Sequence, residues 1–313
     1  MKPLDLSFIS VNYNGKEDTM EMIASIISHV HSISYEIIVV DNASKDKHEI
    51  TLIKEAFPMV ITVRSEENLG FAGGSNLGIN ISRGNNIMLI NNDTLILDDN
   101  FDKLISKMGK TMEFPINNLS TISSRKKIGA ISPKIIFKHP DNTIQFAGYT
   151  PLSKITLRNS IIGYMEPNDG RYSSPYWTPY CHGAAMIVSR EALLQAGEMT
   201  EKYFLYYEEL DWSIQLRKAG FGLLYDPSCF IIHKESQSVG NDSALKTFYM
   251  TRNRLIFATR NLKGVYKTLS IVYQKFISIP KNIIVNQIKG RSEIVKAIYN
   301  GLKSYKNGNK YKI

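Results

Sequence analysis

Strands and helices alternate through the first hundred residues, and this alternation constrains the fold more than any other feature of the chain. Short runs of Val, Ile, Leu and Phe have the length of buried strands, and they lie at residues 6–11, 35–40, 60–63 and 85–90. Segments with apolar residues at helical spacing separate them, at residues 16–30, 46–56 and 72–82. Strands joined through helices lie parallel in one sheet. The sequence therefore predicts an α/β fold with a mainly parallel sheet flanked by helices.

The pattern after residue 90 is less regular. It predicts a helix over 99–113, a polar loop over 115–127, and further strands at 128–135, 143–148 and 183–189. Residues 150–178 are rich in Gly, Pro, Ser, Asn and aromatic residues, which is typical of a long functional loop. Helical segments follow at 191–197 and 207–219, each close to a glycine, and an apolar strand then leads to His233.

Polar side chains stand at the predicted carboxyl ends of three strands. These strands end in Asn-Tyr-Asn-Gly at 12–15, Asp-Asn-Ala-Ser at 41–44 and Asn-Asn-Asp-Thr at 91–94. Each cluster alone is consistent with a turn, because Asn and Asp favour turns. In an open α/β sheet, however, ligands bind outside the carboxyl ends of the strands. Three polar clusters at one edge therefore predict a binding pocket.

The motifs of two common nucleotide sites are absent from the sequence. No G-x-G-x-x-G follows the first strand, where only Gly15 occurs, and no G-x-x-x-x-G-K-[ST] is present. These absences disfavour dinucleotide binding and P-loop phosphoryl transfer. A glycine-rich segment at 68–78 opens a helix instead, and its Gly73 and Gly74 permit close approach of an anion or a ribose.

Three carboxylates, Glu208, Glu209 and Asp211, lie in the first turn of a predicted helix beside Tyr206 and Tyr207. Acidic residues at this position complement the helix dipole, so a purely structural role is the alternative. Carboxylates next to aromatic rings also suit a general base with a raised pKa.

Asp93 and His233 each lie at the end of a predicted strand. A lone histidine is more often a hydrogen-bonded polar group than a ligand. One Asp and one His would nevertheless provide two ligands for Mg²⁺ or Mn²⁺, and the phosphates of a substrate would provide the others.

The formal net charge of +9 comes from the C-terminal segment. Residues 263–313 contain eleven Lys or Arg and one acidic residue, Glu293, which leaves residues 1–262 at −1. This distribution argues against nucleic acid as a partner of the main part of the chain. It also predicts two parts, a globular domain at 1–262 and a basic helical extension at 263–313.

The extension has apolar residues at helical spacing with lysines between them, and Pro280 is expected to interrupt the helix. Basic amphipathic helices of this kind lie in the membrane interface. The alternative is a helical element that packs on the main domain or forms a homodimer. The apolar positions are Val265, Leu269, Val272, Tyr273, Phe276, Ile294, Ile298 and Leu302.

The two cysteines, Cys181 and Cys229, exclude a disulfide framework. The N-terminal sequence does not have the features of a signal peptide, and no run of about 18 apolar residues occurs. We therefore expect a cytoplasmic protein, either free or attached to the inner face of the cell membrane.

In their order along the chain, the motifs resemble those of the family-2 inverting glycosyltransferases, in particular the rhamnosyltransferase-like branch in bacteria. The resemblance spans about residues 6–260 and rests on the strings VNYNG, VVDNAS, ENLGFAGGSNLGI, LINNDT, GAISPKI, GAAMIVSREAL and FLYYEELDWSIQLRKAGF. It implies a GT-A fold, a nucleotide-diphosphate sugar as donor, and a requirement for Mn²⁺ or Mg²⁺.

The resemblance also implies roles for individual residues on the nucleotide side. Asp41 would accept a hydrogen bond from the N3–H of a pyrimidine base. Asn91-Asn92-Asp93 matches the family's Asp-x-Asp motif, with Asn91 in place of the usual first Asp. Other residues implied to hold the donor are Val11, Asn12, Asn14, Asn68, Gly73, Asn76, Asn91 and Asn92.

On the metal and acceptor side, the resemblance implies Asp93 as the metal-binding acid and His233 as a partner of the metal or diphosphate. Glu208 and Glu209 match the family's acidic pair, whose second member is the base. That member is usually Asp, so Asp211 remains an alternative to Glu209 as the base. Arg252 matches a position near the diphosphate or the acceptor.

The implied reaction moves a sugar, with inversion, from a pyrimidine nucleotide-diphosphate donor to a hydroxyl of a cell-surface glycan or lipid-linked acceptor. dTDP-L-rhamnose is the first expectation for the donor and a UDP-sugar the second, and residues 115–127 and 150–178 are expected to contact the acceptor. A sugar nucleotidyltransferase is one alternative, but it should carry a basic glycine-rich loop after the first strand. A non-catalytic sugar-nucleotide-binding module is the other, and the intact acidic cluster at 208–211 disfavours it.

Overall fold

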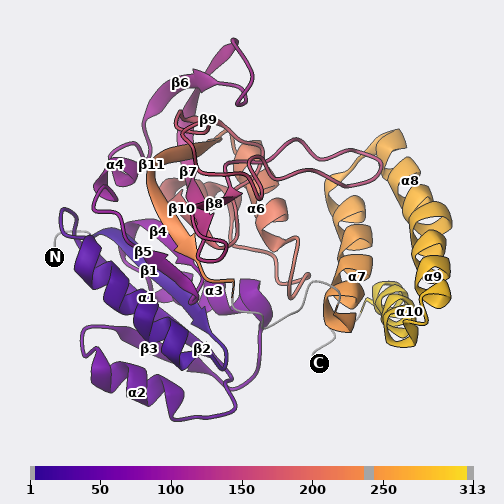
Figure 1. Cartoon of the computed structure of the whole chain (residues 1–313), viewed down its shortest axis with the longest axis horizontal. Coiled ribbons are helices and arrows are strands. Elements are labelled where there is room, and N and C mark those ends of the chain that lie inside the picture. The colour runs from indigo at the N-terminus through magenta and orange to yellow at the C-terminus, as the bar shows by residue number, and fades with distance from the viewer. Residues whose placement is uncertain (1–3, 236–242, 309–313) are drawn as a thin grey trace.

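The computed structural model describes residues 4–235 and 243–308, and its centre is a mixed sheet in the order β3-β2-β1-β4-β10-β7-β11-β5 (Figure 1). Three short strands, β6 (Thr111–Pro115), β8 (Thr143–Phe146) and β9 (Tyr176–Trp177), pair with β7 or β11 beside this row. The strands in the row are β1 (Leu4–Asn12), β2 (Tyr35–Asn42), β3 (Ile61–Ser65), β4 (Gly84–Ile90), β5 (Thr94–Ile96), β7 (Ser123–Phe137), β10 (Ala185–Ser189) and β11 (Gly222–His233).

The predicted parallel strands form one half of the sheet, where β3, β2, β1 and β4 run in the same direction. Their register places Asn12 opposite Asp41, so the polar ends of β1 and β2 are neighbours. The next strand, β10, is antiparallel to β4, with Ala185 opposite Ile90. The beginning of β10 therefore lies at the same sheet edge as the carboxyl ends of the parallel strands.

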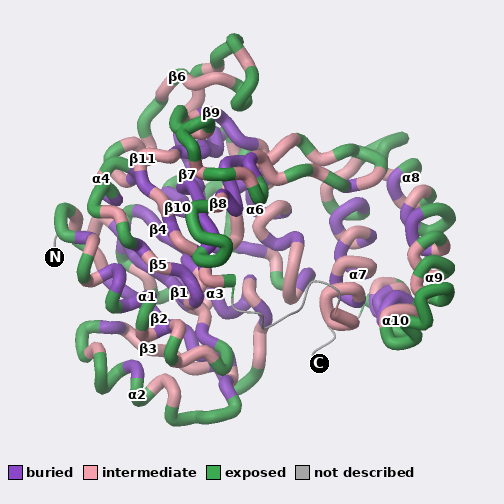
Figure 2. The backbone as a smooth tube through the Cα atoms, viewed as in Figure 1, coloured by how far each residue is buried: buried purple, intermediate pink, exposed green. Residues whose placement is uncertain are grey.

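Alternate residues of the parallel strands enter two separate cores, as the period of a strand requires. Phe8 and Met88 pack in the core on one face of the sheet, beneath α1 and α2. Ile9 and Leu89 pack in the core on the other face, beneath α3, α5 and α6. Strands β1, β2 and β4 are consequently buried along most of their length, as Figure 2 shows in purple, whereas most of β3, at the edge of the sheet, is only partly buried. The helices of these layers are α1 (Lys16–His29), α2 (Glu49–Ala56), α3 (Gly70–Ile81), α5 (Arg190–Ala196) and α6 (Glu208–Lys218).

The helix predicted over 99–113 is wrong. Only a single turn, α4 (Asp102–Ile105), is helical, and Gly109 then adopts a left-handed backbone with φ of 72°. The chain turns there into β6, which forms a hairpin with the start of β7. Phe114 packs edge-on against Trp177, with ring centroids 5.4 Å apart. The loop predicted at 115–127 is therefore shorter than expected, because β7 already begins at Ser123.

The predicted loop at 150–178 contains no helix and no strand before β9. It crosses toward the C-terminal helices in Figure 1, where Gln274 donates through Nε2 to the carbonyl of Thr156 at 3.1 Å. Leu157 is buried in a cluster with Tyr207 and Phe257. The loop thus bridges the sheet domain and the C-terminal helices.

Helices form the C-terminal region, but Pro280 does not interrupt them as predicted. It lies in the first turn of α9, and a π-helical turn joins α9 to α8 before it. Proline is tolerated in a first turn, since its missing N–H has no helical partner there. The last helix packs on α7, and Gly301 lies against the Phe248 carbonyl so closely that a Cβ would come within 2.7 Å. The elements are α7 (Ala244–Asn261), α8 (Gly264–Tyr273), η1 (Gln274–Ser278), α9 (Ile279–Ile288) and α10 (Ser292–Asn307).

Across the described ranges, none of the helices combines the length and apolar character needed to span a bilayer. Cys181 and Cys229 are both buried free thiols. The division of the chain at residue 262 remains a prediction.

Candidate active site

A cavity of about 670 Å³ opens at the sheet edge where the carboxyl ends of the parallel strands lie. Its walls come from the end of β4, the segment before β10, the loop at 157–161, the segment at 205–210 and helix α7. Of the residues predicted from sequence, it brings together Asn91, Glu208, Glu209 and His233. The other lining residues are Phe71, Tyr149, Leu157, Arg158, Asn159, Ile161, His182, Gly183, Ala184, Leu205, Tyr206, Tyr207, Leu210, Lys246, Met250 and Arg254.

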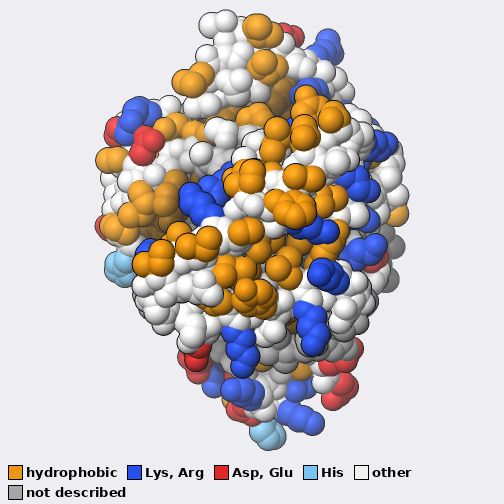
Figure 3. Space-filling view, turned by 90° about the vertical axis from the view of Figure 1, so that its right-hand side faces the viewer, with side chains coloured by type: hydrophobic (Ala, Val, Ile, Leu, Met, Phe, Trp, Pro, Cys, Tyr) orange, Lys and Arg blue, Asp and Glu red, His pale blue; other side chains and the backbone are white. Residues whose placement is uncertain are grey.

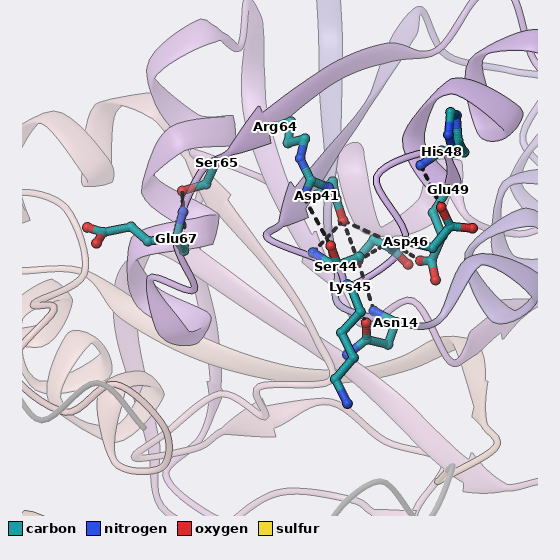
Figure 4. Close-up of polar contacts among 11 residues, drawn as sticks. Asn14, Asp41, Ser44, Lys45, Asp46, His48, Glu49, Arg64, Ser65 and Glu67 are labelled. Atoms are coloured by element: carbon teal, nitrogen blue, oxygen red, sulfur yellow. Dashed lines mark hydrogen bonds and ion pairs between the residues drawn. The ribbon is translucent and has the colours of Figure 1, made fainter.

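The ends of β1 and β2 form a dense hydrogen-bond cluster around Asp41, which Figure 4 shows between Arg64 and Ser44. Asp41 is fully buried and forms an ion pair with Arg64. It also accepts hydrogen bonds from the Ser44 hydroxyl and, at 3.2 Å, from Asn12 Nδ2. The carboxylate predicted to read a nucleobase is therefore already held by its own neighbours. Its predicted role stays a prediction.

Asn12 and Asn14 shape the same cluster. Asn12 is buried, donates to Glu49 Oε2 at 2.9 Å and accepts from the Thr19 hydroxyl at 2.9 Å. Asn14 has a left-handed backbone with φ of 54°, and its Oδ1 accepts from the backbone N–H of Lys45 at 2.8 Å. These contacts fix the loop after β1 against the loop after β2 (Figure 4).

The glycine-rich segment at 68–78 has a packing function that sequence reasoning missed. Gly70 has φ of 72°, and a Cβ there would lie 2.2 Å from the carbonyl oxygen of Phe204. A Cβ on Gly74 would lie 3.0 Å from Val11, so glycine lets α3 pack closely on β1. A Cβ on Gly73 would lie 2.7 Å from Leu69.

Asn68 and Asn76 tie α3 to its surroundings. Asn68 accepts through Oδ1 from Asn42 Nδ2 at 3.1 Å and from the N–H of Gly70 at 2.9 Å. Asn76 is buried and donates to the Met199 carbonyl at 2.9 Å. The hydrogen bond of Asn76 therefore connects α3 to the segment before α6.

The three residues after β4 face different neighbours. Asn91 lines the cavity, and its backbone N–H donates to the Ala184 carbonyl at 2.9 Å. Asn92 points to the start of α1, where it donates to the carbonyl of Gly15 at 3.2 Å. Asp93 is nearly buried and faces His233, with Oδ1 3.0 Å from Nε2.

The His233 side chain is oriented by Gln145, whose Oε1 lies 2.7 Å from Nδ1. A proton on Nδ1 satisfies this contact and leaves the lone pair of Nε2 facing the Asp93 carboxylate. Two electron-rich atoms at 3.0 Å repel each other unless a cation or a second proton lies between them. A carboxylate and an oriented imidazole also match the donors of a Mn²⁺ site. The pair therefore fits a divalent metal, although no group of three His, Cys, Asp or Glu side chains in the described ranges could hold one alone.

His182 is a cavity residue that sequence reasoning missed. It precedes β10, and its ring stacks on Tyr149 with centroids 6.2 Å apart and planes inclined by 10°. Burial, together with nearby His233, lowers the pKa of His182 to about 3, so the ring is neutral. A polar residue just before a strand could have indicated His182 as a site residue. This position lies at the carboxyl edge of the parallel strands only because β10 is antiparallel to β4.

Glu208 and Glu209 begin α6 at the cavity wall. Burial raises the pKa of Glu209 to about 7. Burial and the charge of Glu209 raise the pKa of Glu208 to about 8. Glu208 Oε2 is buried and has no hydrogen-bond partner in the described part of the chain. The cavity therefore contains a carboxyl pair whose pKa values burial raises well above those of exposed glutamates.

Asp211 points away from this cavity. It is buried and accepts from the Tyr203 hydroxyl at 2.7 Å and from Asn261 Nδ2 at 2.7 Å. Arg260 forms an ion pair with it at 2.9 Å. Asp211 thus joins α6 to α7.

The segment before the acidic pair has a left-handed backbone at Phe204, Tyr206 and Tyr207, which is rare for such bulky residues. Asn253 on α7 holds it by donating through Nδ2 to the carbonyls of Tyr203, Leu205 and Tyr206 at 3.1, 2.7 and 2.9 Å. The predicted donor or acceptor residue Arg252 does not line the cavity. It is buried and donates to the carbonyls of Lys202 and Tyr203 at 2.8 and 3.1 Å.

Comparison with known sequences identifies the family. Residues 7–194 match the family described as Glycosyl transferase family 2. The chain belongs to this family. This glycosyltransferase is also 27% identical over 276 residues to the low-salt glycan biosynthesis hexosyltransferase Agl10 of Haloferax volcanii, covering 86% of this chain and 81% of that one. A shorter match, 39% identical over 85 residues, is to the N-acetylglucosaminyl-diphospho-decaprenol L-rhamnosyltransferase of Mycobacterium tuberculosis, covering 27% of this chain and 28% of that one.

Solved structures of glycosyltransferases share the fold. GalNAc-T7 with UDP, GalNAc and Mn²⁺ superposes with a TM-score of 0.59 at 15% identity, covering 90% of this chain and 58% of that one. The mannosyltransferase PcManGT of Pyrobaculum calidifontis, in complex with GDP-Man and Mn²⁺, has a TM-score of 0.54 at 13% identity, covering 99% and 77%. The predicted GT-A fold with a mixed sheet and a helical C-terminal region is thereby confirmed.

Proposed function

We propose that this glycosyltransferase transfers a hexose, with inversion, from a nucleotide-diphosphate sugar to an acceptor hydroxyl, and that Glu209 is the general base. The observation that carries the proposal is the position of Glu209 in the same cavity as Asn91 and His233. A base with a pKa of about 7 is partly ionised at neutral pH and retains enough basicity to accept a hydroxyl proton. Asp211 is the weaker candidate because Arg260 and Asn261 occupy its oxygens.

In the proposed reaction, the Glu209 carboxylate takes the proton of the acceptor hydroxyl as the oxygen bonds to the anomeric carbon. The bond from that carbon to the diphosphate breaks on the opposite face, and the electron pair leaves with the nucleoside diphosphate. A single displacement through an oxocarbenium-like state inverts the configuration. Glu208, protonated up to about pH 8, adds no second negative charge beside the base at neutral pH.

Asp93 and His233 are the proposed ligands of Mn²⁺ or Mg²⁺, supported by the facing carboxylate and imidazole. When bound, the cation would neutralise charge that develops on the departing diphosphate. Gln145, which contacts the other ring nitrogen of His233, would keep the proton on Nδ1 and so leave Nε2 available for the cation.

For the donor we propose a pyrimidine nucleotide, with dTDP-L-rhamnose first and a UDP-sugar second. Support comes from the partial match to a rhamnosyltransferase and from the place of Asp41 at the end of β2. Its buried carboxylate would accept a base N3–H in exchange for one of its present bonds to Arg64 and Ser44. Asp41→Ala should weaken donor binding and reduce the preference for uracil or thymine over cytosine, which lacks the N3–H. Unchanged selectivity would remove Asp41 from the base site. Arg64→Gln is the control, because it breaks the ion pair but keeps the carboxylate.

The proposed acceptor is a glycan or a lipid-linked glycan, bound toward the loop at 150–178. Support for an acceptor at this loop comes from three of its residues that line the cavity, Leu157, Arg158 and Asn159. Residues 115–127 do not line the cavity and have less support as an acceptor contact.

We further propose that the outer face of α8, η1 and α9 rests on an anionic membrane surface on the cytoplasmic side. Figure 3 shows apolar side chains gathered on this side of the molecule, with Lys and Arg side chains beside them. Phe276 is 73% exposed and Ile288 is 81% exposed, while Lys275 in η1, Lys281 in α9 and Lys289 directly after α9 are also exposed. Apolar and cationic side chains together match the interface of an anionic bilayer.

Sedimentation with liposomes tests this surface on the full chain. Truncation near Asn261 is unsuitable because it would uncover α7, on which α10 packs. Phe276→Ser with Ile288→Ser should reduce binding to anionic liposomes at low salt, and neutral liposomes should bind neither protein. Concentration-dependent dimers that the double variant abolishes, without liposome binding, would identify a homodimer face instead.

Nucleoside diphosphate release from dTDP-, UDP-, GDP- and CDP-sugars, with and without Mn²⁺ and a glycan acceptor, tests the reaction itself. We expect metal-dependent release from a pyrimidine donor. Binding without release would support the non-catalytic alternative, and pyrophosphate release from a nucleoside triphosphate would support a nucleotidyltransferase.

A further inference from the structure

A second cavity, of about 230 Å³, lies between helices α7, α9 and α10. It shares Lys246, Met250 and Arg254 with the active-site cavity, so the two meet along α7. In Figure 1, α9 and α10 lie on the side of α7 that faces away from the sheet. The second cavity therefore continues the active site away from the proposed donor and metal residues. Its remaining lining residues are Thr247, Thr251, Asn282, Asn286, Arg291, Ile294 and Ile298.

The lining of this α7–α9–α10 cavity is basic. It contains the cations Lys246, Arg254 and Arg291, and no acidic side chain is among the described residues that form it. Arg254 donates through Nε to the Tyr207 hydroxyl at 3.0 Å, which places its guanidinium where the two cavities meet. Guanidinium and ammonium groups bind phosphate oxygens through charge-assisted hydrogen bonds.

Uncharged polar side chains complete the lining, although the Thr251 hydroxyl already donates to the Thr247 carbonyl at 2.8 Å and Asn286 Nδ2 donates to the Asn282 carbonyl at 2.8 Å. Asn282 and Asn286 face the cavity from one side of α9, and Thr247 and Thr251 face it from α7. Arg291 precedes the first residue of α10, whose first turn also contains Glu293, so the three cations and not the helix end supply the positive charge of the cavity. The chemistry of the cavity thus matches a phosphate or a diphosphate better than an uncharged sugar.

We propose that the α7–α9–α10 cavity binds a phosphate or diphosphate group of the acceptor while the acceptor hydroxyl reaches Glu209. This inference rests on the proposed function, because it names the chemistry of the acceptor for that reaction. The phosphate can belong to a lipid or to a soluble sugar phosphate. An attached lipid would meet the outer side of α9, where Ile284 is 56% exposed and Ile288 is 81% exposed.

Titration calorimetry with geranyl diphosphate and with inorganic pyrophosphate, in EDTA, tests the cavity on the full chain. EDTA prevents metal-bridged binding at Asp93 and His233. We expect Arg291→Gln to weaken binding at least about tenfold, since it removes a charge-assisted contact. Lys296→Gln is the matched control, because Lys296 is exposed on the same helix, lines neither cavity and loses the same charge. Asn282→Ala, which leaves the charge unchanged, should also weaken binding.

The two probes separate the sources of the phosphate. Tighter binding of geranyl diphosphate than of pyrophosphate, lost in Arg291→Gln, supports a lipid phosphate. Equal binding of both, lost in the same variant, supports a soluble phosphorylated acceptor. Absence of binding, or equal affinities in Arg291→Gln and Lys296→Gln, overturns the proposal. The titration needs no donor, so its failure is distinct from a failure to release nucleoside diphosphate.

Discussion

Arg260 donates from Nε to both carboxylate oxygens of Asp211, at 3.1 and 2.9 Å. This ion pair joins α7 to α6 behind the active-site cavity. The pair holds Asp211 outside the cavity that Glu209 lines, although the two residues are only two positions apart in the same helical turn.

Asp211→Asn should therefore act on stability more than on catalysis. The neutral amide leaves buried donors poorly matched, which costs about 1–3 kcal/mol of unfolding free energy. Denaturant unfolding should show this loss, and nucleoside diphosphate release per folded molecule should stay within about tenfold of wild type. A stable but inactive Asp211→Asn would return this residue to the list of candidate bases.

The paired glutamates should make stability depend on pH. Both carboxyls have folded pKa values above the ordinary 4.5, so the folded state binds more protons than the unfolded state between about pH 4.5 and 8. Stability falls as pH rises through this window. Glu208→Gln removes the buried charge and should raise the melting temperature at pH 8 more than at pH 5. An equal change at both pH values would contradict the raised pKa of Glu208.

Asp93 should govern the metal requirement. Asp93→Asn keeps the size of the side chain but removes the charge that a divalent cation needs. Transfer should fall by at least about a hundredfold, and the wild-type increase in melting temperature on adding Mn²⁺ with nucleoside diphosphate should disappear. Asn92→Ala is the control, because Asn92 faces α1 instead of His233. Full activity of Asp93→Asn in EDTA would exclude a metal role.

Asn253 should position the acidic pair without touching the reactants. Its amide supports three carbonyls of the left-handed segment before Glu208. Asn253→Ala should lower kcat while leaving the donor Kd nearly unchanged, and should increase hydrogen exchange in residues 203–207. A variant with wild-type kcat and unfolding free energy would show that the segment holds its shape without this amide.

Much of the fold follows from the sequence because the parallel strands and their helices carry strong local patterns. The polar ends of β1, β2 and β4 were predictable at one edge for the same reason. The helix predicted over 99–113 failed because the apolar residues at helical spacing, Phe101, Leu104, Ile105 and Met108, end just before Gly109. Met112 and Phe114 are two positions apart, as in a strand, and that segment pairs with β7 as β6.

The site was less predictable wherever a residue's partner lies far along the chain. The sequence places Asp211 beside Glu209, but only the packing of α7 brings Arg260 to it. Arg252 likewise matches a binding motif, yet it holds the carbonyls of Lys202 and Tyr203. His182 was missed because the direction of β10 is set by sheet pairing, which local spacing does not reveal.

Glu209→Gln is the direct test of the general base, in an assay of nucleoside diphosphate release with acceptor and the preferred donor. The substitution keeps the shape of the side chain and removes its basicity, so kcat should fall by about 10²–10⁴-fold while the donor Kd stays nearly constant. The wild-type rate should rise with pH through about 7, where Glu209 loses its proton. A Glu209→Gln enzyme with a near-wild-type rate, beside an inactive but folded Asp211→Asn, would contradict the assignment of the base.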